Sequence, residues 1–313
     1  MKILVTGSSG FVASHLCEHL VRAGHQVRAF LHYNHGQTVG NLVHLPKDVM
    51  AEIQGVWGDV RELHDVLRST SDADVIYHLA ALVDVPWSLE SPHSYLETNL
   101  MGTYNILEAA RVFGARVITA SSSEVYGGSK LALSSISARH PRSPYAASKV
   151  AADALAESYH HSYGIKVVIF RAFNTFGPWQ STRALIPHII TQLLQSDEIK
   201  LGNLIPKRSI TYVDDICDAY VKCLDNKKDF LELTVGRQES YSVEKIANMV
   251  KNVMGKEEAK ITQIDNKKRG QWEIPDLRCD PEEAQLELGW KPETEVIDGI
   301  DKTVQWFQSK WKE

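Results

Sequence analysis

The start of the chain holds the feature that most restricts its fold, a strand-like run that passes through a glycine-rich turn into a helix. Residues 2–5 are typical of a buried strand, residues 6–13 read TGSSGFVA, and an amphipathic pattern follows over residues 14–23. Gly7 permits a tight turn, and Gly10 lets the backbone approach a pyrophosphate at the helix amino terminus. This order predicts a dinucleotide site in a doubly wound parallel α/β sheet of the Rossmann type, rather than a structural turn alone.

The second predicted strand, residues 24–31, ends without the carboxylate that would bind the ribose 2′-hydroxyl of NAD. Leu31 and His32 stand at this point, so nothing in the sequence repels a 2′-phosphate. NAD and NADP are both allowed, the sequence favours NADP, and His32 is a candidate contact. Asp59 ends the next strand and would either accept a hydrogen bond from the adenine amino group or cap the helix of residues 62–68.

The strand of residues 74–79 is again followed by small residues, which indicates that the backbone at Ala80 and Ala81 lies against the cofactor. His78, inside this strand, is typical of a packed histidine. The residues that we expect to line the cofactor site are Gly7, Gly10, Phe11, Val12, His32, Asp59, Val60, Leu79, Ala80, Ala81, Tyr145 and Lys149.

Two short clusters carry the most reactive side chains. Ser122 and Glu124 lie in SSSEVYG, which follows strand-like residues 115–120 and so reaches the sheet edge where open α/β folds bind ligands. Tyr145 and Lys149 lie in SPYAASK at the start of a predicted helix, and a spacing of four places them on one face. A nearby ammonium lowers the pKa of a tyrosine, so these groups form a candidate general base for a hydroxyl that loses hydride. A surface tyrosine and lysine on an amphipathic helix is the alternative.

Composition excludes several kinds of partner. A formal net charge of -5 carries no electrostatic footprint for nucleic acid or an anionic membrane. No apolar run is long enough to span a bilayer, and the sequence enters a strand at once without a signal-like segment, so we expect a cytoplasmic protein. Metal-ligand spacing is absent from the cysteines, so we expect no metal site and four buried thiols, at Cys17, Cys217, Cys223 and Cys279.

The alternation of strand and helix signals weakens after residue 170. We therefore expect a dinucleotide-binding domain over residues 1–170 and a smaller, interleaved substrate-binding region over residues 171–313, with some segments that return to the sheet. Long helices are predicted over residues 94–113 and 145–163. Their apolar stripes would either pack in the core or form the helix bundle of a homodimer.

Seven motifs in order carry a resemblance to a known family: TGSSGFVASHL, HLAAL, SSSEVYG, SPYAASK, RAFNTFGP, RSITYVDD and LGWKP. Over essentially its full length the chain resembles an extended short-chain dehydrogenase/reductase of the nucleotide-sugar epimerase and dehydratase group. Within this group, SSE before VYG is similar to the TSE of the 4,6-dehydratases of GDP-mannose and GDP-N-acetylglucosamine. The stretches VRAFLHYN, FNTFGPWQSTRALIPHIITQ and KLGNL most resemble the GDP-N-acetylglucosamine enzymes.

The resemblance implies a role for each reactive residue. Ser122 would be the hydroxyl partner of the base Tyr145, Lys149 would activate this base and bind the ribose, and Glu124 would act as acid and base at C5 and C6. A GDP- or UDP-linked sugar would be the substrate. The residues expected to contact it are Val83, Asn99, Ser123, Asn174, Trp179, Arg208 and Arg269.

The implied reaction is a 4,6-dehydration. C4 is oxidised, water is eliminated across C5 and C6, and the hydride returns to C6, which yields a 4-keto-6-deoxy sugar nucleotide. A UDP-glucuronate decarboxylase is one alternative, although Trp179 stands where it would carry an arginine. A 4-epimerase would leave Glu124 without a task, and an NAD(P)-binding regulator would not need the reactive set. Residues 128–139 lack the carboxylates of many relatives, so this loop is expected to differ.

Overall fold

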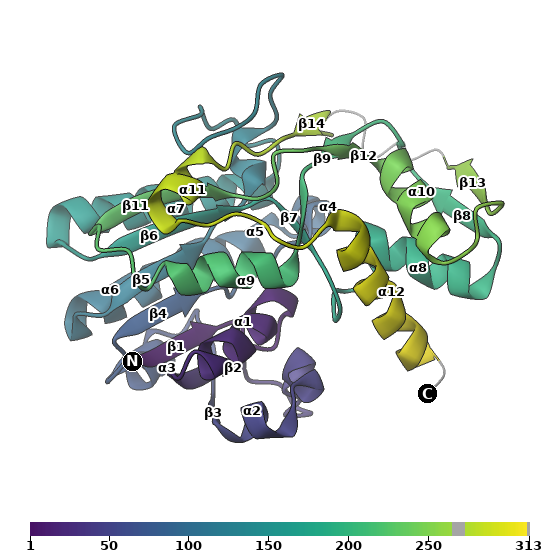
Figure 1. Ribbon diagram of the computed structural model, residues 1–313. Coiled ribbons are helices and arrows are strands. Elements are labelled where there is room, and N and C mark those ends of the chain that lie inside the picture. The colour runs from purple at the N-terminus through teal and green to yellow at the C-terminus, as the bar shows by residue number, and fades with distance from the viewer. Residues whose placement is uncertain (265–272, 312–313) are drawn as a thin grey trace.

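The computed structural model describes residues 1–264 and 273–311, and a parallel sheet of seven strands lies at its centre (Figure 1). The strand order is β11-β6-β5-β4-β1-β2-β3, so the direction of winding reverses between β1 and β4 and leaves a crevice at their carboxyl ends. The doubly wound α/β prediction is confirmed. The strands are β1 Lys2–Thr6, β2 Gln26–His32, β3 Ile53–Gly58, β4 Val75–His78, β5 Arg116–Ala120, β6 Val167–Ala172 and β11 Phe230–Val235.

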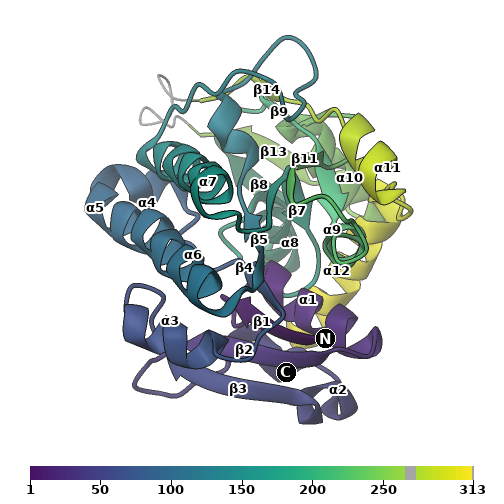
Figure 2. The ribbon, with the colours of Figure 1, turned by 90° about the vertical axis from the view of Figure 1, so that its left-hand side faces the viewer.

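Helices cover both faces of the sheet, which explains why its strands are almost continuously apolar (Figure 2). Because successive side chains of a strand point to opposite faces, Ile3 and Val5 pack in one cluster and Leu4 in the other. The first cluster includes helices α1 Phe11–Arg22 and α9 Val213–Lys222. The second includes helices α3 Leu63–Thr70, α6 Gly102–Phe113 and α7 Pro144–Tyr163.

Most of the chain after residue 172 forms a second region beside the carboxyl ends of the strands (Figure 1). However, α9 and β11 return to the main sheet, so the two regions are interleaved. The division at residue 170 stays a prediction. The helices of the second region are α8 Leu185–Gln195, α10 Val243–Val253, α11 Glu282–Leu288 and α12 Val296–Trp311, and its strands are β7 Asn174–Phe176, β8 Glu198–Leu201, β9 Lys207–Arg208, β10 Ile210–Tyr212, β12 Tyr241–Ser242, β13 Lys260–Gln263 and β14 Asp276–Leu277.

Short helices connect the larger elements. The helix predicted over residues 94–113 is divided: α5 Pro92–Tyr95 leads into the π-helical turn η2 Leu96–Met101 before α6 begins. Such turns often accompany functional sites, and this one contains Asn99. The other short helices are η1 Gly40–His44, α2 Lys47–Ala51, α4 Val85–Glu90 and η3 Ser123–Tyr126.

Two further expectations are tested by the described residues. All four cysteines are buried free thiols, as predicted. Among the helices that the structure describes, none combines the length and apolar character needed to cross a membrane.

Candidate active site

A cavity of about 680 Å³ opens at the carboxyl ends of β1 to β6. Every residue that the sequence predicted for the cofactor lines it, from Gly7 to Lys149. Sequence reasoning missed several lining residues that come from later segments or from helix faces. Thr175 lies within the RAFNTFGP motif and was within reach of the sequence. The others reach the cavity through helix packing, two from α5 and η2 and two from α9. These missed residues are Ser94, Thr98, Thr175, Ile216 and Tyr220.

The turn between β1 and α1 forms the inner wall of the cavity. Gly7 has a φ of +71°, and a Cβ atom there would lie 2.8 Å from the Ala80 amide nitrogen. The Ala80 amide also donates to the Thr6 hydroxyl over 3.1 Å, which fixes the distance between β1 and β4. Gly10 precedes α1 in an extended conformation and offers no side-chain cap, so the backbone amides at this helix end suit a pyrophosphate.

An acidic group and two basic groups meet where the cavity reaches the carboxyl ends of β2 and β3. The Arg61 guanidinium lies 2.6 Å from the Asp59 carboxylate, and the His32 ring lies 3.8 Å from it. Burial alone would raise the pKa of Asp59, but hydrogen bonds from Arg61 bring it below its ordinary value. Glu62, not Asp59, occupies the N-cap position of α3, so the helix-cap alternative is wrong. Asp59 is instead a cavity-lining carboxylate, as a contact to adenine requires.

The predicted catalytic pair lies on the first turns of α7. Ser143 caps this helix by accepting from the Ala146 amide over 3.1 Å, and the cap sets where the helix begins. Tyr145 and Lys149 are both buried and both line the cavity. The Lys149 ammonium donates to the Ala120 carbonyl at the end of β5 over 2.7 Å. Burial lowers the pKa of Lys149 to about 8.

The tyrosine departs from the sequence-based expectation. Burial raises the pKa of Tyr145 to about 12, although a hydrogen bond with the Ser122 side chain acts to lower it, and the nearby Glu124 carboxylate raises it. The expected lowering of the pKa is therefore not found, because desolvation dominates: a phenolate in a dry site loses its hydration. The phenol holds its proton at neutral pH and is hydrogen-bonded to the predicted serine partner.

Glu124 lies beside this pair because of a sharp turn. The Ser122 hydroxyl accepts from the Glu124 amide over 3.2 Å at the start of η3, and the chain leaves through Gly127 with a φ of +67°. A Cβ atom at Gly127 would overlap the His140 carbonyl oxygen at 1.9 Å, so only glycine fits there. Burial raises the pKa of Glu124, and the Arg208 guanidinium opposes this shift. The structure thus brings Ser122, Glu124 and Tyr145 together near Arg208.

The other residues predicted to contact the sugar nucleotide are less uniformly placed. Val83 lines the cavity with 65% of its surface exposed. Ser123 is buried within η3, and Asn174 is exposed at the start of β7, next to cavity-lining Thr175. Arg208 donates to the carbonyl oxygens of Lys207 and Ile274, each over 2.8 Å. The last predicted contact, Arg269, lies outside the described residues.

The Asn99 side chain makes three hydrogen bonds within the protein. Its carboxamide oxygen accepts from the Leu82 amide over 2.8 Å, and its nitrogen donates to the Leu82 carbonyl over 3.0 Å and to the Ser148 hydroxyl over 2.9 Å. The side chain is 1% exposed. Asn99 thus fixes the backbone of the cavity wall and ties it to α7, and its contact with the substrate stays a prediction.

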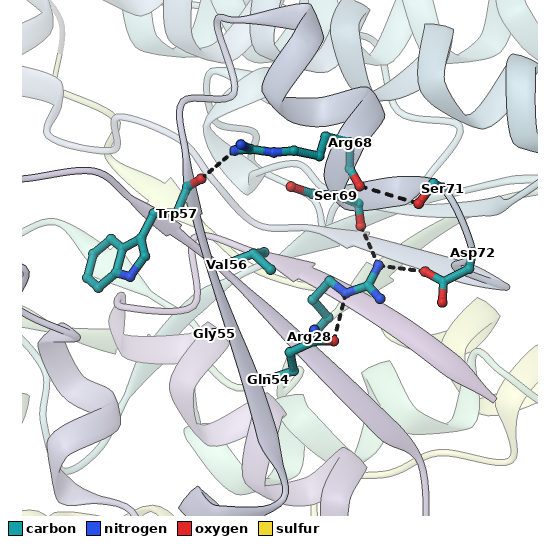
Figure 3. Close-up of a pocket in the computed structure, with 9 residues that line it drawn as sticks. All are labelled: Arg28, Gln54, Gly55, Val56, Trp57, Arg68, Ser69, Ser71 and Asp72. Atoms are coloured by element: carbon teal, nitrogen blue, oxygen red, sulfur yellow. Dashed lines mark hydrogen bonds and ion pairs between the residues drawn. The ribbon is translucent and has the colours of Figure 1, made fainter.

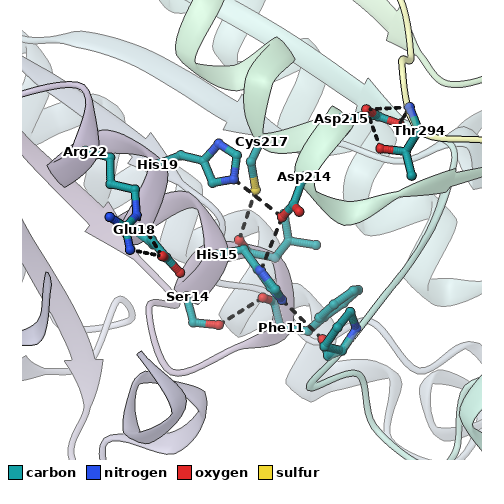
Figure 4. A network of polar contacts seen from close by, with 12 residues as sticks. Phe11, Ser14, His15, Glu18, His19, Arg22, Asp214, Asp215, Cys217 and Thr294 are labelled. Carbon is teal, nitrogen blue, oxygen red and sulfur yellow. Dashed lines mark hydrogen bonds and ion pairs between the residues drawn. The ribbon is translucent and has the colours of Figure 1, made fainter. Parts of the chain in front are cut away.

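Trp179 also has a different place from the one expected. Its indole stacks on the His15 ring of α1, with 3.9 Å between ring centroids, and its backbone has a φ of +69°. His15 itself lies 3.6 Å from the Asp214 carboxylate of α9 (Figure 4). Since the turn after Gly177 directs Trp179 toward α1, its indole packs against His15 of α1 and near His44 of η1. It does not line the cavity, and its predicted contact with the sugar nucleotide stays a prediction.

A second hollow lies between β2, β3 and the end of α3, and it does not resemble a ligand site (Figure 3). It has a volume of about 470 Å³, and two arginines lie beside it. Arg28 donates to the Asp72 carboxylate over 2.6 Å, and Arg68 donates to the Trp57 carbonyl over 2.9 Å. These cations are neutralised or engaged by the protein itself, whereas the larger cavity is lined by Tyr145 and Lys149.

The fold and the reactive groups in its crevice define the chain as an extended short-chain dehydrogenase/reductase of the class that acts on nucleotide sugars. A family model described as GDP-mannose 4,6 dehydratase matches residues 4–303. The chain belongs to this family.

Similar proteins in this class catalyse different reactions. UDP-glucuronic acid decarboxylase 1 of Xenopus tropicalis is 30% identical, with 99% of this chain and 72% of that protein covered. A dTDP-glucose 4,6-dehydratase of Mycobacterium tuberculosis is 29% identical, with coverage of 100% and 96%. The crystal structure of UDP-glucuronic acid 4-epimerase from Bacillus cereus, in complex with UDP-glucuronic acid and NAD, superimposes with a TM-score of 0.89, 28% identity and coverage of 99% and 100%.

Proposed function

We propose that this protein is an NAD-dependent nucleotide-sugar 4,6-dehydratase. The observation that carries the proposal is the place of Glu124, a carboxyl group held beside Tyr145 with a raised pKa. Such a group can take a proton from carbon and give one to a leaving hydroxyl at near-neutral pH. A 4-epimerase needs only the serine, tyrosine and lysine, so it would gain nothing from this carboxyl.

The cavity fits a dinucleotide cofactor. The uncapped amino terminus of α1 suits the pyrophosphate, Asp59 suits the adenine amino group, and Lys149 lies where a ribose hydroxyl could accept from its ammonium. NAD, when bound, would accept the hydride from C4 of the sugar and return it to C6. A similar structure holds NAD, and no comparison supports the NADP preference that the sequence favoured, so we propose NAD.

Three side chains would then move the protons. Tyr145 would take the C4 hydroxyl proton while it passes its own phenol proton, along its hydrogen bond to Ser122, to water. Water would supply the proton that C5 needs when the hydride returns to C6. The C4 ketone acidifies the C5 proton, which Glu124 would remove before it donates to the departing C6 hydroxyl. Arg208, which opposes the rise in the pKa of Glu124, is suited to hold negative charge of the nucleotide sugar nearby.

UDP-glucuronate decarboxylation is the second candidate. The Xenopus tropicalis decarboxylase is 30% identical, and Trp179 no longer argues against this reaction because it lies outside the cavity. The substrate carboxylate would need a cation, for which Arg208 is the candidate among the described residues. Glu124 beside the same position would repel that carboxylate unless it is protonated, and this favours dehydration.

The test is mass spectrometry of reactions in D2O with NAD and a panel of GDP-, UDP- and dTDP-linked hexoses, N-acetylhexosamines and UDP-glucuronate. Loss of water with one deuterium gained at C5 supports the dehydratase and identifies its substrate. Loss of carbon dioxide from UDP-glucuronate would replace the proposal with the decarboxylase. An unchanged sugar mass with a new C4 stereoisomer would replace it with a 4-epimerase.

We also propose that the enzyme is a homodimer. Helices α6 and α7 lie side by side on the outside of the sheet (Figure 2), and apolar side chains are exposed on and around them. Light scattering should give twice the mass of one chain, and Val112→Glu should reduce it to one, whereas Leu286→Glu on α11 should leave it unchanged. The exposed residues of this face are Leu96, Met101, Val112, Phe113 and Tyr163.

A further inference from the structure

A buried network of charges lies behind the candidate site. Arg171 of β6 is 0% exposed, and its guanidinium lies 2.9 Å from the Asp153 carboxylate of α7 and 2.5 Å from the Glu232 carboxylate of β11. Arg139 also lies 2.5 Å from Glu232. These four side chains thus form a continuous series of ion pairs, from Asp153 of α7 through Arg171 of β6 and Glu232 of β11 to Arg139 in the loop before α7.

The network also reaches the turn that carries Glu124. A second nitrogen of Arg171 lies 3.3 Å from the Tyr126 hydroxyl of η3 and 3.3 Å from the Ser135 carbonyl of the 128–142 loop. One guanidinium therefore contacts η3, α7, β11 and this loop, which are the elements around the reactive residues. Arg171 occupies the position where these segments, distant in sequence, must be held in register.

Stability alone is a weak reason for such an arrangement. Desolvation of buried charges offsets most of their attraction, and apolar residues of similar volume often stabilise a protein as well or better. Removal of a single partner is costly, because the remaining charge is then buried and unpaired. A buried charge network on the reactive elements points instead to a need for charge at a defined place.

Asp153 is the member of the network that adjoins the reactive pair. It follows Lys149 by four residues on α7, so both side chains lie on the same helix face, and both are buried. Asp153 raises the pKa of Lys149 against the larger effect of burial, which lowers it. Besides Asp153, the groups that surround the Lys149 ammonium are Tyr145 on α7, the Ala120 carbonyl of β5 and His78 of β4.

His78 does not provide the charge that acts on Lys149. It is fully buried between the hydroxyls of Thr6 and Thr103, at 2.9 and 3.1 Å, and burial lowers its pKa to about 3. It is therefore neutral at working pH and supplies no counter-charge to Lys149. Burial raises the pKa of Asp153, but the Arg171 guanidinium at 2.9 Å opposes this shift and favours the carboxylate. Tyr145 holds its proton, so Asp153 is the acidic side chain that acts on the ammonium.

We propose that Asp153, held in place by Arg171, is a positioning residue that acts through its charge and keeps the Lys149 ammonium protonated beside Tyr145. The inference rests on the roles of Lys149 and Tyr145 in the proposed function, but it concerns only groups of this chain. Without the anion, the buried lysine would lose its proton more readily, and its hold on a ribose hydroxyl and its electrostatic support of the tyrosine would weaken.

The test measures the protonation of Lys149 directly. The rate of acetylation of Lys149 by acetic anhydride is followed by peptide mass spectrometry from pH 6 to 10 in the wild type, in Asp153→Asn and in Glu232→Gln. The midpoint should lie near 8 in the wild type and move down by about one pH unit in Asp153→Asn. Glu232→Gln removes a charge of the same network, but Glu232 does not act on Lys149. The midpoint in this variant should therefore equal that of the wild type.

A second variant covers the case in which Asp153→Asn does not fold. The double change Asp153→Asn with Arg171→Met removes both charges together and avoids an unpaired buried cation. It should fold by circular dichroism and show the same lowered midpoint. An unchanged midpoint in either folded variant would overturn the proposal, whatever its effect on stability.

Activity gives an independent readout once a substrate is known. In Asp153→Asn the alkaline limb of the kcat profile should move to lower pH by the same amount as the labelling midpoint, with the KM for the nucleotide sugar within about twofold. A uniform loss of kcat at every pH would mark a merely structural residue and contradict the inference. If the wild type converts no nucleotide sugar, the proposed function fails while the labelling result still decides the role of Asp153.

Discussion

The two halves of the cavity were predictable to very different degrees. Every residue predicted for the cofactor half lines one cavity, from the Gly7 turn to Lys149. Of the residues predicted for the substrate half, Asn99 binds the backbone of Leu82 and Trp179 stacks on His15, and neither lines the cavity. The first half is built from short motifs that each follow a strand, so strand order alone brings them together. The second half is built from loops whose direction depends on what they pack against.

This difference indicates where the chemistry of the chain can vary. The cofactor half is fixed by close backbone packing, such as that of Gly7 against Ala80, and tolerates little change. The substrate half is carried by side chains on turns and short strands, and proteins of this class with about 30% identity act on different sugars. Mutations can therefore test whether the halves are separable, beginning with the largest expected effect.

Gly7→Ala should abolish NAD binding and turnover. The new Cβ would lie 2.8 Å from the Ala80 amide at a left-handed φ, so β1 and β4 must separate. Gly24→Ala is the matched control, because Gly24 has a φ of +80° but no atom within 4 Å of the new Cβ. Both variants should lose about 1–2 kcal/mol from the left-handed backbone. Calorimetric titration with NAD should separate them, and wild-type affinity in Gly7→Ala would contradict the proposed pyrophosphate site.

Glu124→Gln should act on the substrate half alone. We expect kcat for dehydration to fall about 10²- to 10⁴-fold, because the amide cannot exchange the C5 and C6 protons. The affinity for NAD should stay within about twofold, since Glu124 does not line the cofactor cavity. Single-turnover spectroscopy should still show reduced nicotinamide if C4 oxidation remains. Normal dehydration by this variant would remove Glu124 from the mechanism.

The Glu124→Gln substitution should also show how much the buried carboxyl group lowers the stability of the folded state. Burial raises the pKa of Glu124 above its ordinary 4.5, so the folded state binds this proton more tightly than the unfolded state. Stability from this group is present below pH 4.5 and falls as pH rises through the raised pKa. Glu124→Gln should therefore melt above the wild type at pH 7.5, with a gap that narrows toward pH 4.5. A pH-independent gap would show that packing, not ionisation, causes the difference.

The smallest effect on catalysis is expected at Trp179. Trp179→Ala should cost about 1–3 kcal/mol of stability through the lost stacking on His15, with the KM for the sugar nucleotide within about twofold. Trp87, which lines the cavity and is 55% exposed, is the matched control. Trp87→Ala should raise KM about tenfold with little change in melting temperature. The opposite pattern would place the hexose against Trp179, as the sequence had suggested.

Local signals were sufficient wherever a residue's role depends on its neighbours in sequence. The strand, the glycine turn and the helix at the start of the chain specify a crevice because parallel strands with crossover helices place their carboxyl ends along one edge. The spacing of Tyr145 and Lys149 specifies a shared helix face. Even the buried state of the cysteines was predictable, since isolated thiols without ligand spacing pack as small apolar groups.

The sequence failed where the answer depends on burial or on distant partners. It predicted a lowered pKa for Tyr145, but desolvation by surrounding segments raises it to about 12. It could not foresee that Asn99 would meet Leu82 and Ser148, or that Asp153 would meet Arg171 across the sheet. These contacts join residues that only the packed fold brings together.

The sequence by itself determined the doubly wound sheet, the cofactor crevice and the reactive set, because each follows from local periodicity and motif spacing. Only the tertiary structure decided which polar side chains face the cavity and which ones are used to hold its walls. It also decided their protonation, since a pKa depends on water excluded by the whole molecule. In this protein, the exclusion of water shifts the pKa values of Tyr145, Lys149 and Glu124 more than their neighbours in sequence do.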